Sequence, residues 1–514
     1  MTLVRTRSAA VLLGSLAGSY LAWNYVRYLV RAFRSPLRKL PAASDTFWAV
    51  ILGPLDRFRI GIKTFFNHIH CLHQKHGPVV VTDANTISVA DPELVKLVLV
   101  THDFPKPASY STTFRFVGHS STDSLFSTTD KLYHRRMRRT LSHSFGLQEL
   151  GALEPFMDKC ITSTFDHLDY LHAQEASGNP AYVTIDLWRF LGCFALDVIG
   201  ETAFGLSFNM IEKQAHPLPS AIVRRFYFTI TAYVFPWIRY LFFLPGVRDE
   251  RADLSYIEAF MRDIIQQRRK TDSGPKRGDL LQRIIEAKDP ETGEPLTDEE
   301  VAANTVMFLI AGSETTGNTM SFALIKLLEN PRALKQLVAE IDAAHVEPTS
   351  GLISHDTAKS LPYLNAVIYE VLRLVPVVAG GPLREFPSDM IFGGYFIPKN
   401  TRVVVSTIAT HHNPQIWTEP DEFLPERFLD LEHVTGVFKS HEAKGELLPF
   451  SSGSRNCIGR NFALMEIRLF LANFLRKYEI EDVPGQAKDL VLAVTLRLAS
   501  ETYRIKIKPR TGPC

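Results

Sequence analysis

One ten-residue segment carries the residue types that could bind a metal-containing group. It holds the pattern F-x-x-G-x-R-x-C-x-G, whose fixed positions are Phe450, Gly453, Arg455, Cys457 and Gly459. A cysteine thiolate is a soft metal ligand, and Cys457 stands at the entrance of a segment with the pattern of an amphipathic helix. The positive end of the helix dipole and the free N–H groups are expected to lower the pKa of its thiol. The two glycines are expected to let the backbone turn tightly and approach a flat ligand.

The arginine and the phenylalanine of this pattern would complete such a site. Arg455 would place a cation beside the ligand, suited to a carboxylate group, and Phe450 would shield the sulfur from water. A lone cysteine in a glycine-rich turn is more often a buried structural residue. Five matched positions in a ten-residue window instead favour a thiolate ligand to iron.

This cysteine loop resembles that of the cytochrome P450 family, the haem-thiolate monooxygenases. The resemblance extends over nearly the whole chain, because several independent motifs carry it. It implies haem b as the cofactor, with Cys457 as the proximal ligand of the iron.

A second motif, AGSETT at residues 311–316, matches the oxygen-activation sequence of the family. Ala311 and Gly312 would leave room for a ligand against the helix. The acid–alcohol pair Glu314 and Thr315 would move protons toward the reacting oxygen. Alone, such a string is more often a solvated helix turn. Its position in a long helix upstream of the cysteine loop favours the catalytic interpretation.

Three further charged residues match structural motifs of the family. Glu370 and Arg373 form E-x-x-R, which places both side chains on one face of a helix. Such a pair is usually a modest surface interaction. In the family the pair is buried and joined by the arginine of a downstream P-x-R-F, here Arg427. The resemblance therefore implies a structural lock on the cysteine loop and no catalytic role.

Three basic residues match positions that contact the haem propionates in the family. His134 and Arg138, in KLYHRRMRR, fit W/H-x-x-x-R, with His where many members have Trp. Arg384, in GGPLREFP, matches another propionate-binding arginine. The neighbouring arginines of KLYHRRMRR fit a solvated basic face or a docking surface for an acidic redox partner.

Two helical patterns would position these motifs. The first begins after Thr297, which forms a capping box with Glu300, and runs for about 32 residues to an Asn-Pro pair at 330–331. AGSETT lies in the middle of this helix. The second pattern starts at Pro362 and ends before Pro376, and it carries E-x-x-R.

Short extended segments accompany the helices. Residues 79–90 are expected to form a hairpin with Asp-Ala-Asn as its turn, and residues 392–406 are expected to be extended. The rest of the chain is mainly helical. The expected fold is therefore mainly α with small β-sheets (α+β), in a single large cytochrome P450-like domain over residues 40–514.

Residues 1–39 differ from the rest of the chain. An uncharged, mostly apolar run of 19 residues, at about 8–26, would span about 28 Å as a helix, close to one hydrocarbon core. It is followed by the basic residues Arg27, Arg31, Arg34, Arg38 and Lys39. The positive-inside rule then predicts a single-pass transmembrane helix with the catalytic domain in the cytosol, at the endoplasmic reticulum membrane. A cleaved signal peptide is the alternative, against which the basic stop argues.

Composition limits the remaining classes of protein. Of the 514 residues, 46% are apolar and 22% are charged, which indicates a globular protein with a large core. The net charge of +2 gives no sign of a nucleic-acid partner. The five cysteines include no C-x-x-C pair, which argues against a disulfide framework or a structural zinc site and fits a reducing compartment.

The reaction implied by the resemblance inserts one atom of O₂ into an organic substrate while the other atom leaves as water. The sequence has no G-x-G-x-x-G fingerprint, so the electrons would come from a separate membrane-bound NADPH-dependent flavoprotein reductase. One alternative is a haem-thiolate isomerase or dehydratase that acts on peroxides, and another is a non-enzymatic haem sensor or electron carrier. The acid–alcohol pair argues against both.

Two aromatic-rich regions, residues 104–126 and 224–246, correspond to the variable pocket regions of the family. Their composition suits a lipophilic substrate that enters from the bilayer. The uncharged part of the second region is short and contains Pro236, so it is expected to dip into the membrane surface without spanning it. These regions resemble those of fungal members, which points to secondary metabolism.

Overall fold

The chain divides into two compact units. A computed structural model describes residues 18–20, 22–27, 29–30, 33–42, 65–114, 122–175, 182–234, 238, 241, 245–270, 277–429, 447–492 and 494–510. The first unit, here called the sheet unit, comprises residues 1–107 and 380–413. The second, here called the helical unit, comprises residues 108–379 and 414–514.

The expected transmembrane helix at about 8–26 lies mostly outside the described residues. In the described ranges, no helix is long and apolar enough to cross a membrane.

The sheet unit is built on a four-stranded sheet with the order β1-β2-β7-β4. Its strands are β1 (Val79–Asp83), β2 (Thr86–Val89), β4 (Leu383–Glu385) and β7 (Arg402–Val405). β2 and β7 are parallel, whereas the β1–β2 and β4–β7 pairs are antiparallel. The predicted hairpin is thus confirmed. Its turn is shorter than expected, because Asp83 still pairs with Thr86.

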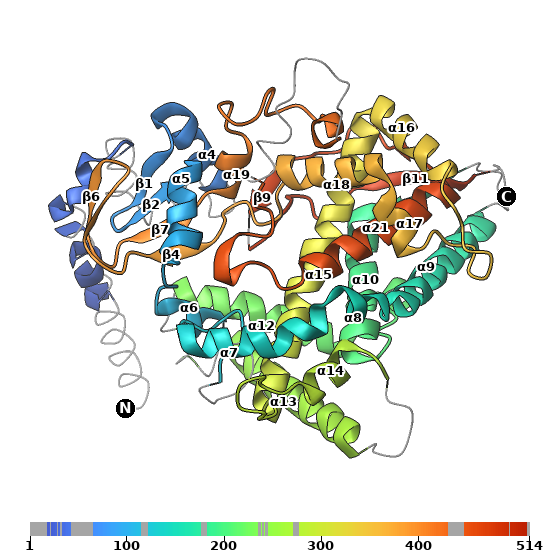
Figure 1. The fold of residues 1–514 in the computed structure, drawn as a ribbon, viewed down its shortest axis with the longest axis horizontal. Helices are drawn as coiled ribbons and strands as arrows, with labels where there is room; N and C mark the ends of the chain where they lie inside the picture. Colours follow the sequence, from blue (N-terminus) through green and yellow to red (C-terminus); the bar gives the residue numbers. More distant parts are fainter. Residues whose placement is uncertain are drawn as a thin grey trace, which may run out of the picture. The chain divides into compact units, whose positions relative to one another are not determined.

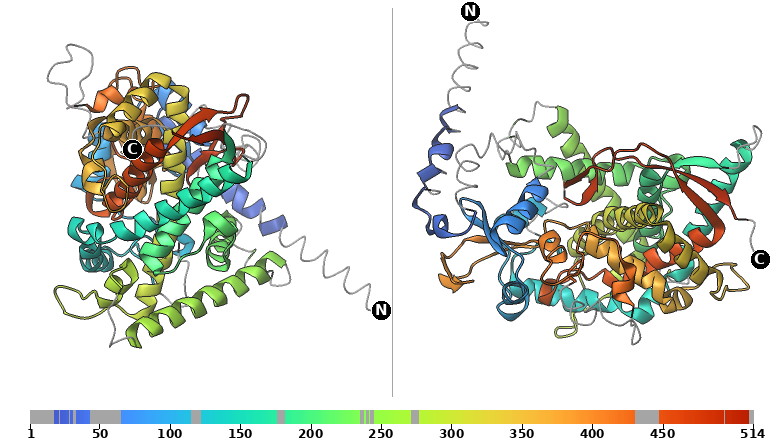
Figure 2. Two further views of the ribbon diagram at one scale, coloured as in Figure 1. Left: turned by 90° about the vertical axis from the view of Figure 1, so that its right-hand side faces the viewer. Right: turned by 90° about the horizontal axis from the view of Figure 1, so that it is seen from above.

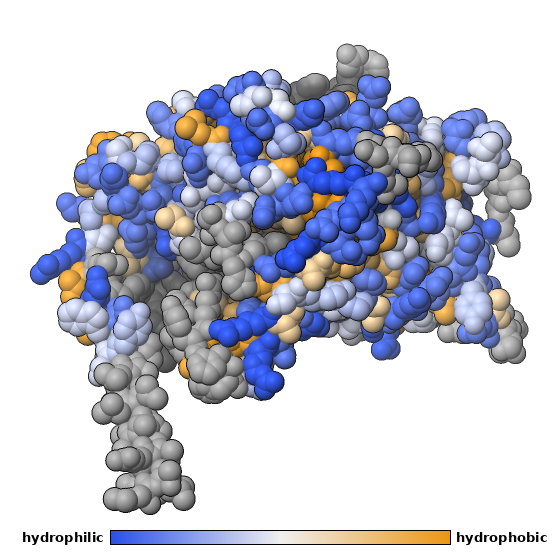
Figure 3. All heavy atoms as spheres, turned by 90° about the horizontal axis from the view of Figure 1, so that it is seen from below, coloured by the Kyte–Doolittle hydropathy of each residue, from blue (hydrophilic) through white to orange (hydrophobic). Residues whose placement is uncertain are grey.

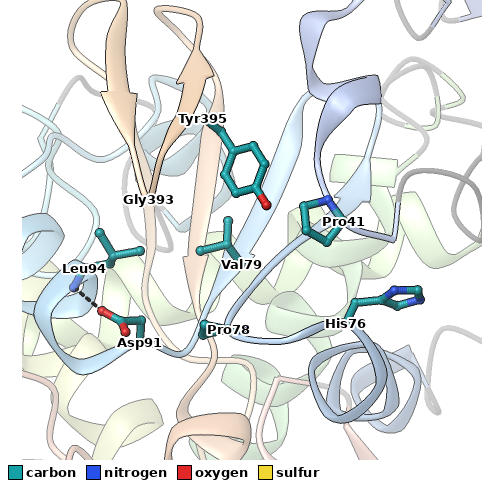
Figure 4. A pocket seen from close by; sticks show the side chains of 8 residues that line it. All are labelled: Pro41, His76, Pro78, Val79, Asp91, Leu94, Gly393 and Tyr395. Atoms are coloured by element: carbon teal, nitrogen blue, oxygen red, sulfur yellow. Dashed lines mark hydrogen bonds between the residues drawn. The ribbon is translucent and has the colours of Figure 1, made fainter.

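A second hairpin and several short helices complete the sheet unit. The hairpin joins β5 (Met390–Phe392) to β6 (Tyr395–Ile397), which together with β7 confirms the extended segment at 392–406. The short helices are η1 (Pro36–Lys39), α4 (Phe65–His76), α5 (Pro92–Lys96), η3 (Leu97–Thr101) and α19 (Thr407–His411). A cavity of about 370 Å³ lies in this unit, with His76, Asp91 and Tyr395 in its wall (Figure 4). None of the predicted site residues lines it.

Helices dominate the second unit. Those that precede its central helix are α6 (Ser109–Phe114), α7 (Lys131–Ser142), η4 (His143–Phe145), α8 (Leu147–Gly151), α9 (Glu154–Glu175), α10 (Leu187–Ile199), η6 (Gly200–Phe204), α11 (Met210–Lys213), α12 (Pro217–Val234), α13 (Pro245–Lys270) and α14 (Leu280–Glu286). Those from the central helix onward are α15 (Asp298–Glu329), α16 (Pro331–Asp342), α17 (His355–Ser360), α18 (Pro362–Leu374), η8 (Pro425–Phe428), η10 (Gly453–Arg455) and α21 (Arg460–Lys477).

The long helix predicted from the capping box is α15, and it is confirmed at 32 residues. Thr297 Oγ1 accepts a hydrogen bond from the Glu300 N–H at 3.2 Å, and Glu300 Oε2 accepts one from the Thr297 N–H at 3.0 Å. α15 packs against α10, α18 and α21 (Figure 1). The helix is therefore the central support of this unit.

Two helices downstream of α15 were also predicted. α18 begins at Pro362 and ends at Leu374, as expected, with most of its side chains buried. α21 follows the cysteine loop. The small sheets of this unit are a three-stranded sheet with the order β3-β11-β8 and a two-stranded β9–β10 hairpin. Their strands are β3 (Val183–Asp186), β8 (Tyr478–Asp482), β9 (Leu490–Leu492), β10 (Leu496–Leu498) and β11 (Arg504–Pro509). A mainly helical fold with small sheets is thus confirmed.

The aromatic-rich region 224–246 begins within α12, which packs beside α13 (Figure 2). Of its second half, only parts lie within the described residues. Figure 3 shows that hydrophilic side chains cover much of the described part of one molecular face, with smaller hydrophobic areas between them.

Candidate active site

The cysteine loop forms a tight turn that ends at α21. Gly453 has a φ of +76°, a left-handed conformation that favours glycine, and the Cys457 N–H donates to the Phe450 carbonyl at 2.9 Å. Gly459 has an ordinary φ of −83°. A Cβ at Gly459 would meet only the Cys457 Sγ, at 4.0 Å. The expected need for a tight turn is therefore confirmed at Gly453, while Gly459 keeps space open beside the sulfur.

The environment of the Cys457 thiol differs from the expectation. Cys457 has exposed surface, yet the protein atoms packed around its sulfur raise the pKa of the thiol above its ordinary value. A hydrogen bond from Gly459 and the charges of Arg138 and Arg460 act in the lowering direction. The prediction of a net lowered pKa was wrong, because burial outweighs these three contributions.

The predicted propionate contacts are divided between the two units. Arg138 lies close enough to Cys457 for their charges to interact, and it donates to Asn456 O at 2.7 Å and to Asn456 Oδ1 at 2.6 Å. His134 lies one turn earlier on α7 and is buried. Arg384 is buried in the sheet unit, on β4.

Arg455, the arginine of the cysteine loop itself, also contacts the backbone. Arg455 Nη1 donates to the Thr128 carbonyl at 2.9 Å. Two loop positions are thereby tied to the segment around α7: Asn456 through Arg138, and Arg455 through Thr128. The structure brings these basic side chains to one loop.

Two arginines on the basic face of α7 form ion pairs within the chain. Arg136 forms an ion pair with Glu300, and Arg139 forms one with Glu291. These two guanidinium groups already have acidic partners within the chain. They are not simply solvated charges.

Between its exposed ends, α15 is largely buried except around Ala311. Its buried positions continue on both sides, but Ala311 is exposed and Thr315 is only half-buried. Gly312 also allows close packing of α15 on α10, since a Cβ there would approach the Ile199 Cδ1 to 3.1 Å. Room for a ligand is therefore present at Ala311, whereas Gly312 allows close helix packing.

The acid–alcohol pair has specific partners. Thr315 Oγ1 donates to the Ala311 carbonyl at 2.5 Å, within the helix. Glu314 Oε1 accepts a hydrogen bond of 2.7 Å from Thr495 Oγ1, in the β9–β10 turn. Thr316 is 1% exposed, and its hydroxyl has no hydrogen-bond partner among the described residues. The two neighbouring threonines thus face different surroundings.

The structure brings Glu370, Arg373 and Arg427 together in one buried cluster. Glu370 accepts from Arg373 Nε and Nη2, both at 2.8 Å, and from Arg427 Nε at 3.1 Å. Burial lowers the pKa of the Arg427 guanidinium, against the raising effect of Glu370. Among the described residues, both arginines also donate to carbonyl groups of residues 418–422. The cluster therefore joins α18 to the segment around η8.

These observations fit a flat iron-containing group. Cys457 offers a soft sulfur donor with open space beside it, because Gly459 has no Cβ. Arg138 and Arg455 supply cations at the same loop, which suits carboxylates on the edge of the ligand. Ala311 leaves a small exposed surface on a helix that is otherwise largely buried. Haem fits this combination.

Comparison with known proteins gives the same class. The family model described as Cytochrome P450 matches residues 46–509. "Cytochrome P450 monooxygenase FUS8" of Gibberella moniliformis is 33% identical over 488 residues, which is 94% of this chain and 90% of the relative. "Cytochrome P450 monooxygenase acrD" of Aspergillus aculeatus is 33% identical, with 96% of this chain and 97% of the relative covered.

A solved structure confirms the fold. The crystal structure of the cytochrome P450DA haem domain superposes with a TM-score of 0.74 at 25% sequence identity, covering 87% of this chain and 93% of that chain. The chain therefore belongs to the cytochrome P450 family. It is an oxidoreductase of the monooxygenase class whose cofactor is haem iron.

Two residues at the site were not anticipated from the sequence. Asn456 binds Arg138, and its place next to Cys457 in the loop could have suggested a role. Thr495 binds Glu314 from a turn 181 residues away. No local pattern marks Thr495, so only the fold could reveal it.

Proposed function

We propose that Cys457 binds the haem iron and that Arg138, Arg455, His134 and Arg384 hold the propionates. The observation that carries this proposal is the exposed residue Cys457, with Gly459 beside its sulfur and Arg138 at the same loop. Phe450 and Gly453 shape the loop around the sulfur. When bound, the haem iron supplies the activation of O₂.

Glu314 and Thr315 would move protons at the site. Both lie where α15 has exposed surface, and both carry oxygen atoms that can donate or accept a proton. Glu370, Arg373 and Arg427 would keep α18 and the η8 segment in register and take no part in the chemistry. Their complete burial supports a structural role.

The substrate of this proposal is a lipophilic organic molecule, and the co-substrate is O₂. The aromatic content of regions 104–126 and 224–246 supports an apolar substrate. A role in secondary metabolism belongs to the same proposal, and the fungal origin of the relatives supports it. A comparison of metabolites between cells with and without the protein would identify the compound that it consumes.

Electrons would come from a separate NADPH-dependent flavoprotein reductase. The chain would be held at the endoplasmic reticulum membrane by a transmembrane helix at about 8–26. In this arrangement residues 1–39 are the anchor and basic linker, and residues 40–514 are the catalytic domain in the cytosol. The apolar run and the basic residues that follow it support this orientation.

Stoichiometry tests the proposed reaction. With a reductase and a substrate, a monooxygenase consumes one NADPH and one O₂ for each hydroxylated product. A peroxide isomerase or dehydratase would form product without NADPH or O₂, and a sensor would form none. Product formation that is independent of both NADPH and O₂ would overturn the proposal.

A further inference from the structure

The turn between β9 and β10 holds the side chain of Glu314. Thr495 Oγ1 donates a hydrogen bond of 2.7 Å to Glu314 Oε1, although the residues belong to elements far apart in the sequence. Thr495 is only 5% exposed, so water competes little for its hydroxyl. Hydrogen bonds to a carboxylate are among the stronger ones in proteins.

The hydroxyl of Thr495 is held in place by the backbone that follows it. The Leu496 N–H donates to the Val377 carbonyl at 2.7 Å, and the Leu496 carbonyl accepts from Asn318 Nδ2 at 3.2 Å. Asn318 lies one helical turn after Glu314 on α15 and is itself buried. The turn is therefore bonded to α15 both at Asn318 and at Glu314. Together with the bond to Val377, these contacts fix the position of Thr495.

One carboxylate oxygen of Glu314 thus accepts a hydrogen bond from Thr495. Glu314 Oε2 accepts no hydrogen bond from the residues that the structure describes, and the neighbouring Thr315 hydroxyl is bound to Ala311. A carboxylate fixed through one oxygen keeps its second oxygen at a defined position. A proton donor or acceptor is more effective when its geometry is fixed in advance.

We propose that Thr495 is a positioning residue for Glu314. By binding Oε1 it holds the carboxylate so that Oε2 can pass protons at the site. Thr495 itself touches no reacting atom. This inference rests on the proposed role of Glu314 in proton delivery.

The first test compares Thr495→Val, Thr495→Ser and Glu314→Ala in the haem-loaded protein with its reductase. Thr495→Val nearly keeps the shape but removes the hydroxyl, with its bond to Glu314 and its longer bond of 3.5 Å from Asn318 Nδ2. Product formed per NADPH should fall by roughly three- to tenfold, the range for the lost bond to Glu314. Thr495→Ser should recover most of the loss. Thr305→Val is the control for loss of a buried threonine hydroxyl. Thr305 lies on α15, as Glu314 does, and its hydroxyl donates only to the Val301 carbonyl.

The second test needs no turnover. The thermal unfolding midpoints of Thr495→Val, Glu314→Ala and the double variant form a double-mutant cycle. If the hydroxyl acts through Glu314, the loss in the double variant should be clearly smaller than the sum of the two single losses. The double variant should also form no less product per NADPH than Glu314→Ala alone.

The outcomes separate this inference from the proposed function. A normal yield in Glu314→Ala would overturn the role of Glu314 itself, and Thr495 with it. A reduced yield in Glu314→Ala with a normal yield in Thr495→Val would overturn the role of Thr495 alone. Additive losses of the unfolding midpoint would likewise show that Thr495 does not act through Glu314.

Discussion

Replacing Glu370 by alanine should be among the most destabilising single changes in this protein. The Glu370 carboxylate is fully buried and accepts hydrogen bonds from Arg373, from Arg427 and from the Leu424 N–H, the last at 2.8 Å. Its removal would leave Arg373, 0% exposed, and Arg427, 3% exposed, as buried cations that have lost the carboxylate between them.

The expected magnitude follows from this burial. Breaking a buried ion pair by removing one partner costs about 3–5 kcal/mol, because the remaining charge has lost its compensation. Native proteins are stable by only about 5–15 kcal/mol. Glu370→Ala should therefore lose a large fraction of the total stability.

A pair with the same spacing at the surface provides the control. Lys326 and Glu329, also three residues apart on a helix, form an ion pair at 2.8 Å with side chains 27% and 28% exposed. Exposed pairs contribute about 0–1 kcal/mol, so Lys326→Ala should unfold close to wild type. Urea unfolding followed by circular dichroism measures both variants. Equal midpoints for Glu370→Ala and Lys326→Ala would refute the assignment of Glu370 as a buried structural centre.

Two further predictions concern proton delivery and the membrane. Thr315→Val should continue to consume NADPH while hydrogen peroxide rises and product falls by about 10²–10⁴, the usual value of general acid–base catalysis. Thr316→Val should keep the wild-type yield, because the Thr316 hydroxyl is buried and has no partner among the described residues; equal losses in the two variants would contradict the assignment. Removal of residues 1–39 should release most of the protein from the membrane fraction and leave its haem spectrum unchanged. A secreted protein with a processed N-terminus would contradict the predicted anchor.

Features that depend on neighbours in the sequence could be predicted. The capping box at Thr297 and Glu300 fixed the start of α15, and the prolines at 331 and 362 marked where helices end or begin. The motif positions in the cysteine loop and in E-x-x-R could also be read directly, because each lies within ten residues. Glu370 and Arg373 do form the expected pair.

Features that depend on tertiary packing could not be predicted. The close approach of Gly312 to Ile199 is one example, because Ile199 comes from another helix and no local pattern indicates the contact. The direction of the pKa shift of Cys457 was wrong for the same reason, since burial by the folded chain outweighs the nearby charges. The bond from Thr495 to Glu314 likewise exists only because the β9–β10 turn packs on α15.

The most direct test of the account is the absorption spectrum of the reduced protein with carbon monoxide. Cys457→His should still bind haem but lose the red-shifted band that thiolate ligation produces. Cys160→Ala and Cys193→Ala should keep that band, because both thiols are buried, in α9 and α10, and neither belongs to the cysteine loop. A red-shifted band that persists in Cys457→His would contradict the assignment of Cys457 as the iron ligand.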